Sequence, residues 1–215
     1  CAVTVWTLNL SRVGFRAVTF PPLMACSLLL LWRGLPSRAN GARRPGLWYM
    51  AGAGALYGPC FYTYLVARFS VLALLLYALY SLLRDRRRFW LGGWLLFAAA
   101  SLLVALPLLI YFLQHWDSTL GRIGQVSIFS PAINEGRLPG AFLRHLWLTF
   151  RAFVDRGDTI PRHNVPGRPI FDPLLSMAFW VGLALAVRRS PRQSACALGA
   201  IWLAVMVWPT ILAED

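Results

Sequence analysis

Long apolar runs constrain this chain more than any other feature, because several of them are long enough to cross a lipid bilayer as helices. Hydrophobic residues make up 58% of the 215 residues, charged residues 13%, and the mean hydropathy is +0.58. Soluble domains contain about 45–50% apolar residues. The pattern therefore predicts one all-α domain, a polytopic membrane bundle of about six spans. The expected spans cover residues 17–32, 47–64, 69–83, 90–112, 173–187 and 195–212.

Arginine gives the expected orientation of these spans. The formal charge is +13, and every basic side chain other than histidine is arginine. Clusters fall in the short loops that follow the first, third and fifth expected spans: Arg33, Arg38, Arg43 and Arg44; Arg84, Arg86, Arg87 and Arg88; Arg188, Arg189 and Arg192. With alternating spans these loops share one side, and the positive-inside rule makes that side cytoplasmic. We therefore expect a multi-pass cell-membrane protein in contact with membrane lipids, and no nucleic-acid partner.

The stretch between the fourth and fifth expected spans, residues 115–172, is predicted to be an outer-face loop with structure of its own. Within it, Leu138–Val154 places apolar side chains at helical spacing with Arg144, His145 and Arg151 between them. This spacing predicts an amphipathic helix lying in the membrane interface. The loop then continues as Gly157–Asp172, with the sequence GDTIPRHNVPGRPIFD.

This polar stretch supplies the main candidate site. Arg162 and Arg168 offer planar forks of donors that suit phosphate oxygens, and His163 and Asn164 add further donors. Three prolines restrict the backbone that carries them. A structural alternative stays open, in which these arginines pair with Asp155, Asp158 and Asp172 or with lipid headgroups. The complete set of predicted substrate-binding residues is Arg12, Arg16, Tyr64, Arg68, Asp158, Arg162, His163, Asn164 and Arg168.

Several common kinds of site lack their sequence patterns. Cys1, Cys26, Cys60 and Cys196 show no spacing typical of a metal or disulfide site, so no metal ligand is assigned. The glycine-rich patterns of nucleotide-binding loops and the Ser–His–Asp arrangement are also missing. The sequence does not indicate a cofactor.

Four stretches together resemble the membrane part of glycosyltransferase family 39, the protein mannosyltransferases and aminoarabinose transferases of the GT-C superfamily. Trp6–Arg16 is similar to the family's juxtamembrane segment with an SR-x-G-x-R pattern. Tyr62–Tyr64 with Arg68 resembles an aromatic segment that opens a later span, and Gly157–Asp172 resembles a loop of many bacterial members. Pro209–Asp215 resembles the start of a further outer loop.

The resemblance implies transfer of a sugar from a polyprenyl-phosphate donor to an acceptor on the outer face. In the family a carboxylate in the first outer loop acts as the base, and cationic groups stabilise the leaving phosphate. The chain begins at Cys1 and is expected to be a piece of a larger protein with that carboxylate upstream. No catalytic residue is therefore assigned, and the isolated chain is expected to be inactive. The sugar and the acceptor are left open.

A non-enzymatic transporter or lipid-flipping subunit is the alternative interpretation. Transporters usually have interrupted helix pairs and ionisable residues at mid-membrane depth. Here the polar residues concentrate in one loop and the middles of the expected spans lack charge, which favours the enzyme.

Overall fold

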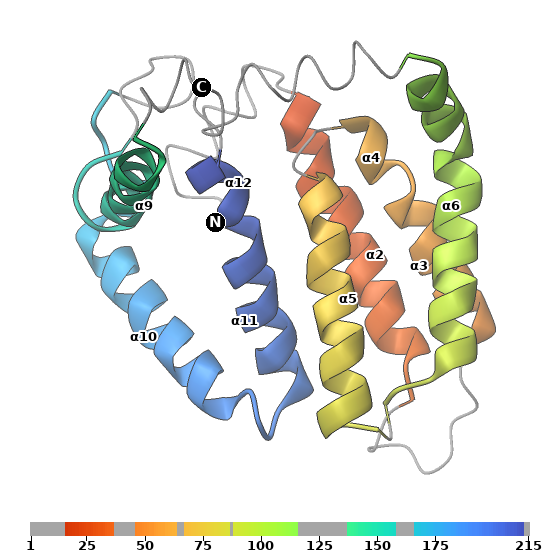
Figure 1. Cartoon of the computed structure of the whole chain (residues 1–215). Helices are drawn as coiled ribbons and strands as arrows, with labels where there is room; N and C mark the ends of the chain where they lie inside the picture. The colour runs from red at the N-terminus through yellow and green to blue at the C-terminus, as the bar shows by residue number, and fades with distance from the viewer. Residues whose placement is uncertain are drawn as a thin grey trace.

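The computed structural model describes residues 16–36, 46–63, 67–86, 88–115, 137–157 and 166–212. Over these ranges the chain forms helices and turns and contains no β-strand. Most of the helices run side by side and alternate in direction, so that they form a bundle with two ends (Figure 1). The expectation of an all-helical fold is confirmed.

The first half of the bundle comes from the N-terminal half of the chain. Its elements are the short 3-10 helix η1 (Arg16–Thr19), α2 (Phe20–Gly34), α3 (Leu47–Tyr57), the single turn α4 (Cys60–Thr63), α5 (Ala67–Arg84) and α6 (Leu91–Gln114). Prolines in the first turn start α2, where their missing N–H groups leave no unmade helical bond. A turn at Gly58 and Pro59 separates α3 from α4, within the second expected span.

The second half consists of α9 (Leu138–Val154), α10 (Pro173–Arg189), α11 (Ser194–Met206) and α12 (Trp208–Leu212). A short turn joins α10 to α11 as an antiparallel pair, and α11 packs against α5 of the first half. Figure 1 shows α9 nearly end-on, lying across the upper end of the bundle against α12 and α10. The helix expected over Leu138–Val154 is therefore present, whereas its place in a membrane interface stays a prediction.

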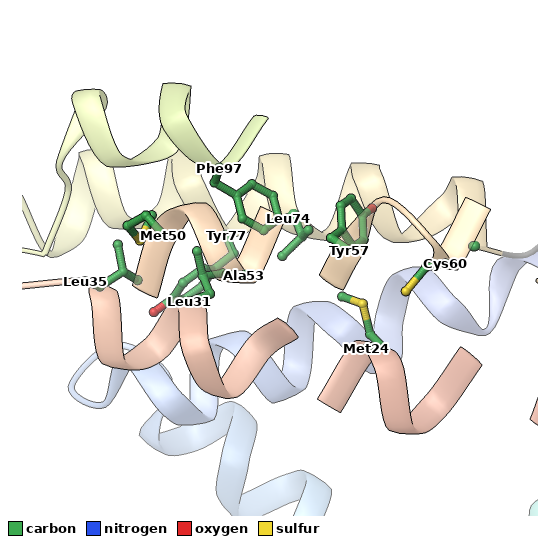
Figure 2. Close-up of a cluster of buried hydrophobic side chains, with 11 residues drawn as sticks. Met24, Leu31, Leu35, Met50, Ala53, Tyr57, Cys60, Leu74, Tyr77 and Phe97 are labelled. Carbon is green, nitrogen blue, oxygen red and sulfur yellow. The ribbon is translucent and has the colours of Figure 1, made fainter. Parts of the chain in front are cut away.

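The core lies between α2, α3, α5 and α6. Figure 2 shows side chains from these helices converging, among them Leu31, Met50, Tyr77 and Phe97. Met50 and Tyr77 are fully buried. Polar side chains inside this half bond to neighbouring helices: Ser27 Oγ donates to the carbonyl of Ala53 at 2.8 Å, and the Tyr57 and Ser70 hydroxyls are 2.7 Å apart.

Close packing of α3 on α6 requires glycine. A Cβ at Gly54 would lie 2.2 Å from the carbonyl oxygen of Phe97, and a Cβ at Gly58 would lie 2.6 Å from Cβ of Val104. Small residues let two backbones approach closely, which favours helix association where lipid gives no hydrophobic gain. Gly54, within the small-residue stretch Ala51–Ala55, is thus the position at which α3 lies against the backbone of α6.

Three helical segments in the described ranges have the length and apolarity to cross a membrane: Ala67–Arg84, Leu91–Gln114 and Ser194–Leu212. Phe20–Gly34 is a shorter apolar helix. These segments coincide with four of the six expected spans. A membrane protein is therefore supported, and the finer count of spans belongs to the proposal below.

The arginine-rich turns that the structure describes lie at one end of the bundle, the lower end in Figure 1. Arg33 is in the last turn of α2, Arg84 in the last turn of α5, and Arg188 and Arg189 in the last turn of α10. α4, α9 and α12 lie at the opposite end. The common placement agrees with the alternation expected from the sequence.

Candidate functional site

The structure describes part of the predicted site. Arg68 and Arg168 are described with their side chains, and Arg16 lies at the start of η1 with only its backbone described. The other predicted residues lie outside the described ranges: Arg12, Tyr64, Asp158, Arg162, His163 and Asn164.

Arg168 lies in the turn that leads into α10. Its Nη2 donates to Oδ1 of Asp172 at 3.1 Å, and both side chains are exposed. Gly167, just before it, has a φ of +76°, a left-handed conformation that glycine adopts without strain. An exposed pair of this kind contributes little to stability. The guanidinium therefore stays accessible at the surface while its carboxylate partner orients it.

Backbone bonds fix this turn to the end of α9. The N–H of Gly157 donates to the carbonyl of Gly167 at 3.3 Å, and the N–H of Ile170 donates to the carbonyl of Ala152 at 2.9 Å. The first bond joins residues on either side of 158–165, the segment that contains Arg162, His163 and Asn164. The two flanks of the predicted site are therefore held together at one point of the fold.

An aromatic cluster supports the same corner. The ring of Phe153 lies 5.3 Å from that of Phe179 and 6.1 Å from that of Phe171, and Trp180 packs edge-on against Phe153. Ser176 Oγ donates to the carbonyl of Phe153 at 2.6 Å. Aromatic pairs at these distances stabilise beyond their buried area. The end of α9, the turn and the start of α10 thus form one packed unit.

A second ion pair lies beside this unit. Arg151 Nη2 is 2.7 Å from Oδ2 of Asp155, one helical turn further along. The hydrogen bonds from Arg151 hold the pKa of the Asp155 carboxyl below its ordinary value, and they raise the pKa of Arg151. Asp155 was considered as a partner for the arginines of the loop, and in the structure Arg151 occupies it. Of the ion pairs in the structural alternative, Arg168–Asp172 is therefore present, whereas Asp155 is paired with Arg151.

Arg68 occupies a different part of the same end of the bundle. It is the second residue of α5, and its guanidinium carbon lies 4.7 Å from the ring centre of Phe112 in the last turns of α6. The neighbouring Tyr111 stacks on His115 with ring centres 4.3 Å apart. A guanidinium over an aromatic face keeps its edges available for hydrogen bonds.

The described candidate residues therefore lie in two separate groups. One group is on α5 and α6, with Arg68 and Phe112, and the other is on the α9–α10 corner, with Arg168 (Figure 1). Phe112 was missed by sequence reasoning, because an aromatic residue near the end of a span usually belongs to the interfacial belt. The sequence could have indicated this contact, because the end of α6 and the start of the antiparallel α5 are expected at the same end of the bundle.

No protein-family model, curated protein or solved structure matches this chain. The family resemblance of the four stretches therefore stays an interpretation of the sequence, and the argument for a function depends on residues and geometry.

Proposed function

We propose that the protein is a membrane glycosyltransferase that uses a polyprenyl-phosphate sugar and acts on the outer face of the cell membrane. The observation that carries the proposal is the α9–α10 corner. It is a polar, arginine-bearing turn bonded to two helices, at the bundle end opposite the arginine-rich turns. Such a corner suits an anionic lipid phosphate arriving from the membrane. The sequence resemblance of the same segment adds the sugar-transfer chemistry.

In the proposed reaction an acceptor hydroxyl attacks the anomeric carbon of the donor sugar. The bond between that carbon and the phosphate oxygen breaks, polyprenyl phosphate leaves, and the hydroxyl proton passes to a carboxylate base. Arg162 and Arg168, with His163 and Asn164, stabilise the charge on the leaving phosphate. Arg12, Arg16, Tyr64, Arg68 and Asp158 complete the proposed substrate site, and no residue of this chain is assigned as the base.

Charge placement favours this function over transport. The three apolar helical segments long enough to span a membrane carry arginine only at their ends, at Arg68 and Arg84 of α5, and no acidic residue. A transporter or proton-coupled carrier usually needs ionisable groups at mid-membrane depth. In the part of the chain that the structure describes, the charged side chains instead lie at the ends of the bundle.

The proposal includes six spans, with the arginine-rich short loops in the cytoplasm. Reporter fusions at Arg86 and Ser190 should therefore report the cytoplasm, and a fusion at Thr119 should report the outer face. The same side for Arg86 and Thr119 would refute this topology.

The function is tested by sugar transfer from a labelled polyprenyl-phosphate donor in the full-length, membrane-embedded protein that contains this chain. Arg162→Ala and Arg168→Ala, made separately, should each lower kcat/KM by about ten- to a hundred-fold, since a charge-assisted hydrogen bond contributes about 1.5–3 kcal/mol. Arg137→Ala, an exposed arginine just before α9, is the matched control and should keep full activity.

Thermal stability measured beside activity separates the outcomes. Lost activity at unchanged stability supports a phosphate site. Full activity in both variants would leave the turn as a headgroup anchor, and a joint loss of activity and stability would favour the structural ion pairs. Transport of the lipid without sugar transfer would refute the enzyme and favour the alternative, a transporter or lipid-flipping subunit.

A further inference from the structure

Two arginine-rich turns, distant in the sequence, are bonded to each other at the lower end of the bundle. The hydroxyl of Tyr80 on α5 donates to the carbonyl of Ser190 in the α10–α11 turn at 2.6 Å. Ser194 Oγ at the start of α11 donates to Oδ2 of Asp85, which follows α5, at 2.5 Å. These side-chain bonds tie together segments more than a hundred residues apart in the chain. The charged residues on both turns therefore belong to one surface.

We call this surface the arginine platform; its members are Arg84, Arg86, Arg88, Arg188, Arg189 and Arg192 on the two turns, together with Arg33 at the adjoining end of α2. All of them except Arg88 are exposed. Asp85 is the only acidic residue described at this end, since Asp155 and Asp172 lie at the other. It pairs with Arg88 at 3.6 Å and with Ser194. In the described ranges, the other arginines of the platform have no carboxylate partner, so the surface carries a large excess of positive charge.

Aromatic rings adjoin these charges. The guanidinium carbon of Arg88 lies 4.3 Å from the ring centre of Trp32, and both side chains are partly buried. Tyr80 is also partly buried, and Trp90 immediately precedes α6. Tryptophan and tyrosine with an apolar body and a polar edge are typical of the depth at which lipid headgroups begin. The platform therefore combines basic and interfacial side chains at the ends of apolar helices.

We propose that the arginine platform binds the phosphate headgroups of anionic phospholipids in the adjacent leaflet, as a single surface assembled from both turns. Arginine forks match phosphate oxygens, and several arginines near an anionic surface add their attraction. A lipid is the occupant that the geometry favours, because the platform ends helices that themselves are apolar enough to lie in the bilayer. The proposal does not depend on the sugar-transfer function, which concerns the opposite end.

The first experiment exchanges lipid around the purified protein. Retention of phosphatidylglycerol relative to phosphatidylcholine is measured by native mass spectrometry, together with the unfolding temperature in each lipid. R188Q/R189Q/R192Q should lower the preference for phosphatidylglycerol by about tenfold or more, since each arginine near an anionic surface contributes about fivefold. R137Q/R144Q/R156Q removes the same charge from exposed positions at the other end and should lower the preference by less than R188Q/R189Q/R192Q does.

A second variant tests whether lipid binding requires the bonds between the two turns or only the number of arginines. Y80F/S194A removes both bonds between the turns and keeps every arginine. It should lower the preference for phosphatidylglycerol severalfold, while the unfolding temperature in phosphatidylcholine reports any general loss of fold. An unchanged preference for phosphatidylglycerol in this variant would refute the claim that the two turns act as one surface. An equal loss of preference in R188Q/R189Q/R192Q and R137Q/R144Q/R156Q would refute a lipid site at the platform. Binding of a polynucleotide or acidic protein through the same arginines, without lipid preference, would also overturn it.

Discussion

The two halves of the bundle are held together in different ways. In the α2–α6 half, Met50, Ala53 and Tyr77 are fully buried, and glycine brings α3 against the backbone of α6. In the described part of the α9–α12 half the buried hydrophobic side chains are fewer and smaller, namely Ala197, Val205 and Ile211, and α10 leaves Leu174 79% exposed. Ring contacts around Phe153 and backbone bonds at the α9–α10 corner supply much of its order.

We interpret the α2–α6 half as a scaffold and the α9–α12 half as the part that carries the candidate site. Between apolar helices in lipid, close van der Waals packing is the main source of association. The α2–α6 half has that packing and should tolerate few core changes. The α9–α12 half places a polar turn on a small packed corner, so changes there should affect binding more than global stability. Each prediction below tests this contrast, from the largest expected effect to the smallest.

Gly54→Ala should cause the largest loss of stability. The new Cβ would lie 2.2 Å from the carbonyl oxygen of Phe97, and a backbone atom cannot move aside as a flexible side chain can. Overpacking of this kind costs about 3 kcal/mol or more. The unfolding temperature in a fixed lipid or detergent measures it.

Gly182→Ala on α10 is the matched control, because nothing lies within 4 Å of the added methyl group. It should be neutral or slightly stabilising, since alanine has the higher helix propensity. Similar losses in both variants would contradict the contrast between the halves.

Phe153→Ala should have an intermediate and more local effect. It removes the ring contacts to Phe171, Phe179 and Trp180 that hold the turn against α9 and α10. Because the ring is only partly buried, the cost should be about 2 kcal/mol, less than that of a fully buried phenylalanine. Amide exchange at Ile170 should become faster, since its bond to Ala152 depends on this packing. Unchanged exchange would show that the turn is fixed in another way.

Asp155→Asn should have the smallest effect, and one that depends on pH. The pKa of Asp155 is lowered by Arg151, so the pair stabilises the fold above the ordinary pKa of aspartate. The contribution is lost as the pH falls through the lowered pKa of the folded state. The difference in unfolding temperature between wild type and variant should therefore be small near neutral pH and vanish once the pH has fallen below the lowered pKa of Asp155. A difference that grows on acidification would contradict this pair.

Sequence reasoning was most successful where periodicity and length decide structure. The Leu138–Val154 helix has the expected bounds, and apolar runs predicted the helices from α2 to α12 within a few residues. The turn at Gly58 and Pro59 divides the second expected span at two residues that commonly interrupt a helix. These features are local, so the residues that carry them lie next to each other in the chain.

The features that sequence reasoning missed join distant segments. Asp85 contacts Arg88 three residues along the chain, and it also accepts a hydrogen bond from Ser194, more than a hundred residues away. Arg68 was predicted as a substrate-binding residue, and its contact with Phe112 depends on the register between α5 and α6. Pairings of this kind follow from tertiary packing, which a single sequence does not specify.

Binding of polyprenyl phosphate compared with polyprenol tests the central claim most directly. Both lipids carry the same apolar tail, so any difference reports the phosphate alone. The account predicts that polyprenyl phosphate raises the unfolding temperature of the membrane-embedded protein, that polyprenol does not, and that Arg162→Ala/Arg168→Ala abolishes the difference. Equal shifts with both lipids, or a difference that survives this double substitution, would contradict a phosphate site at the α9–α10 corner.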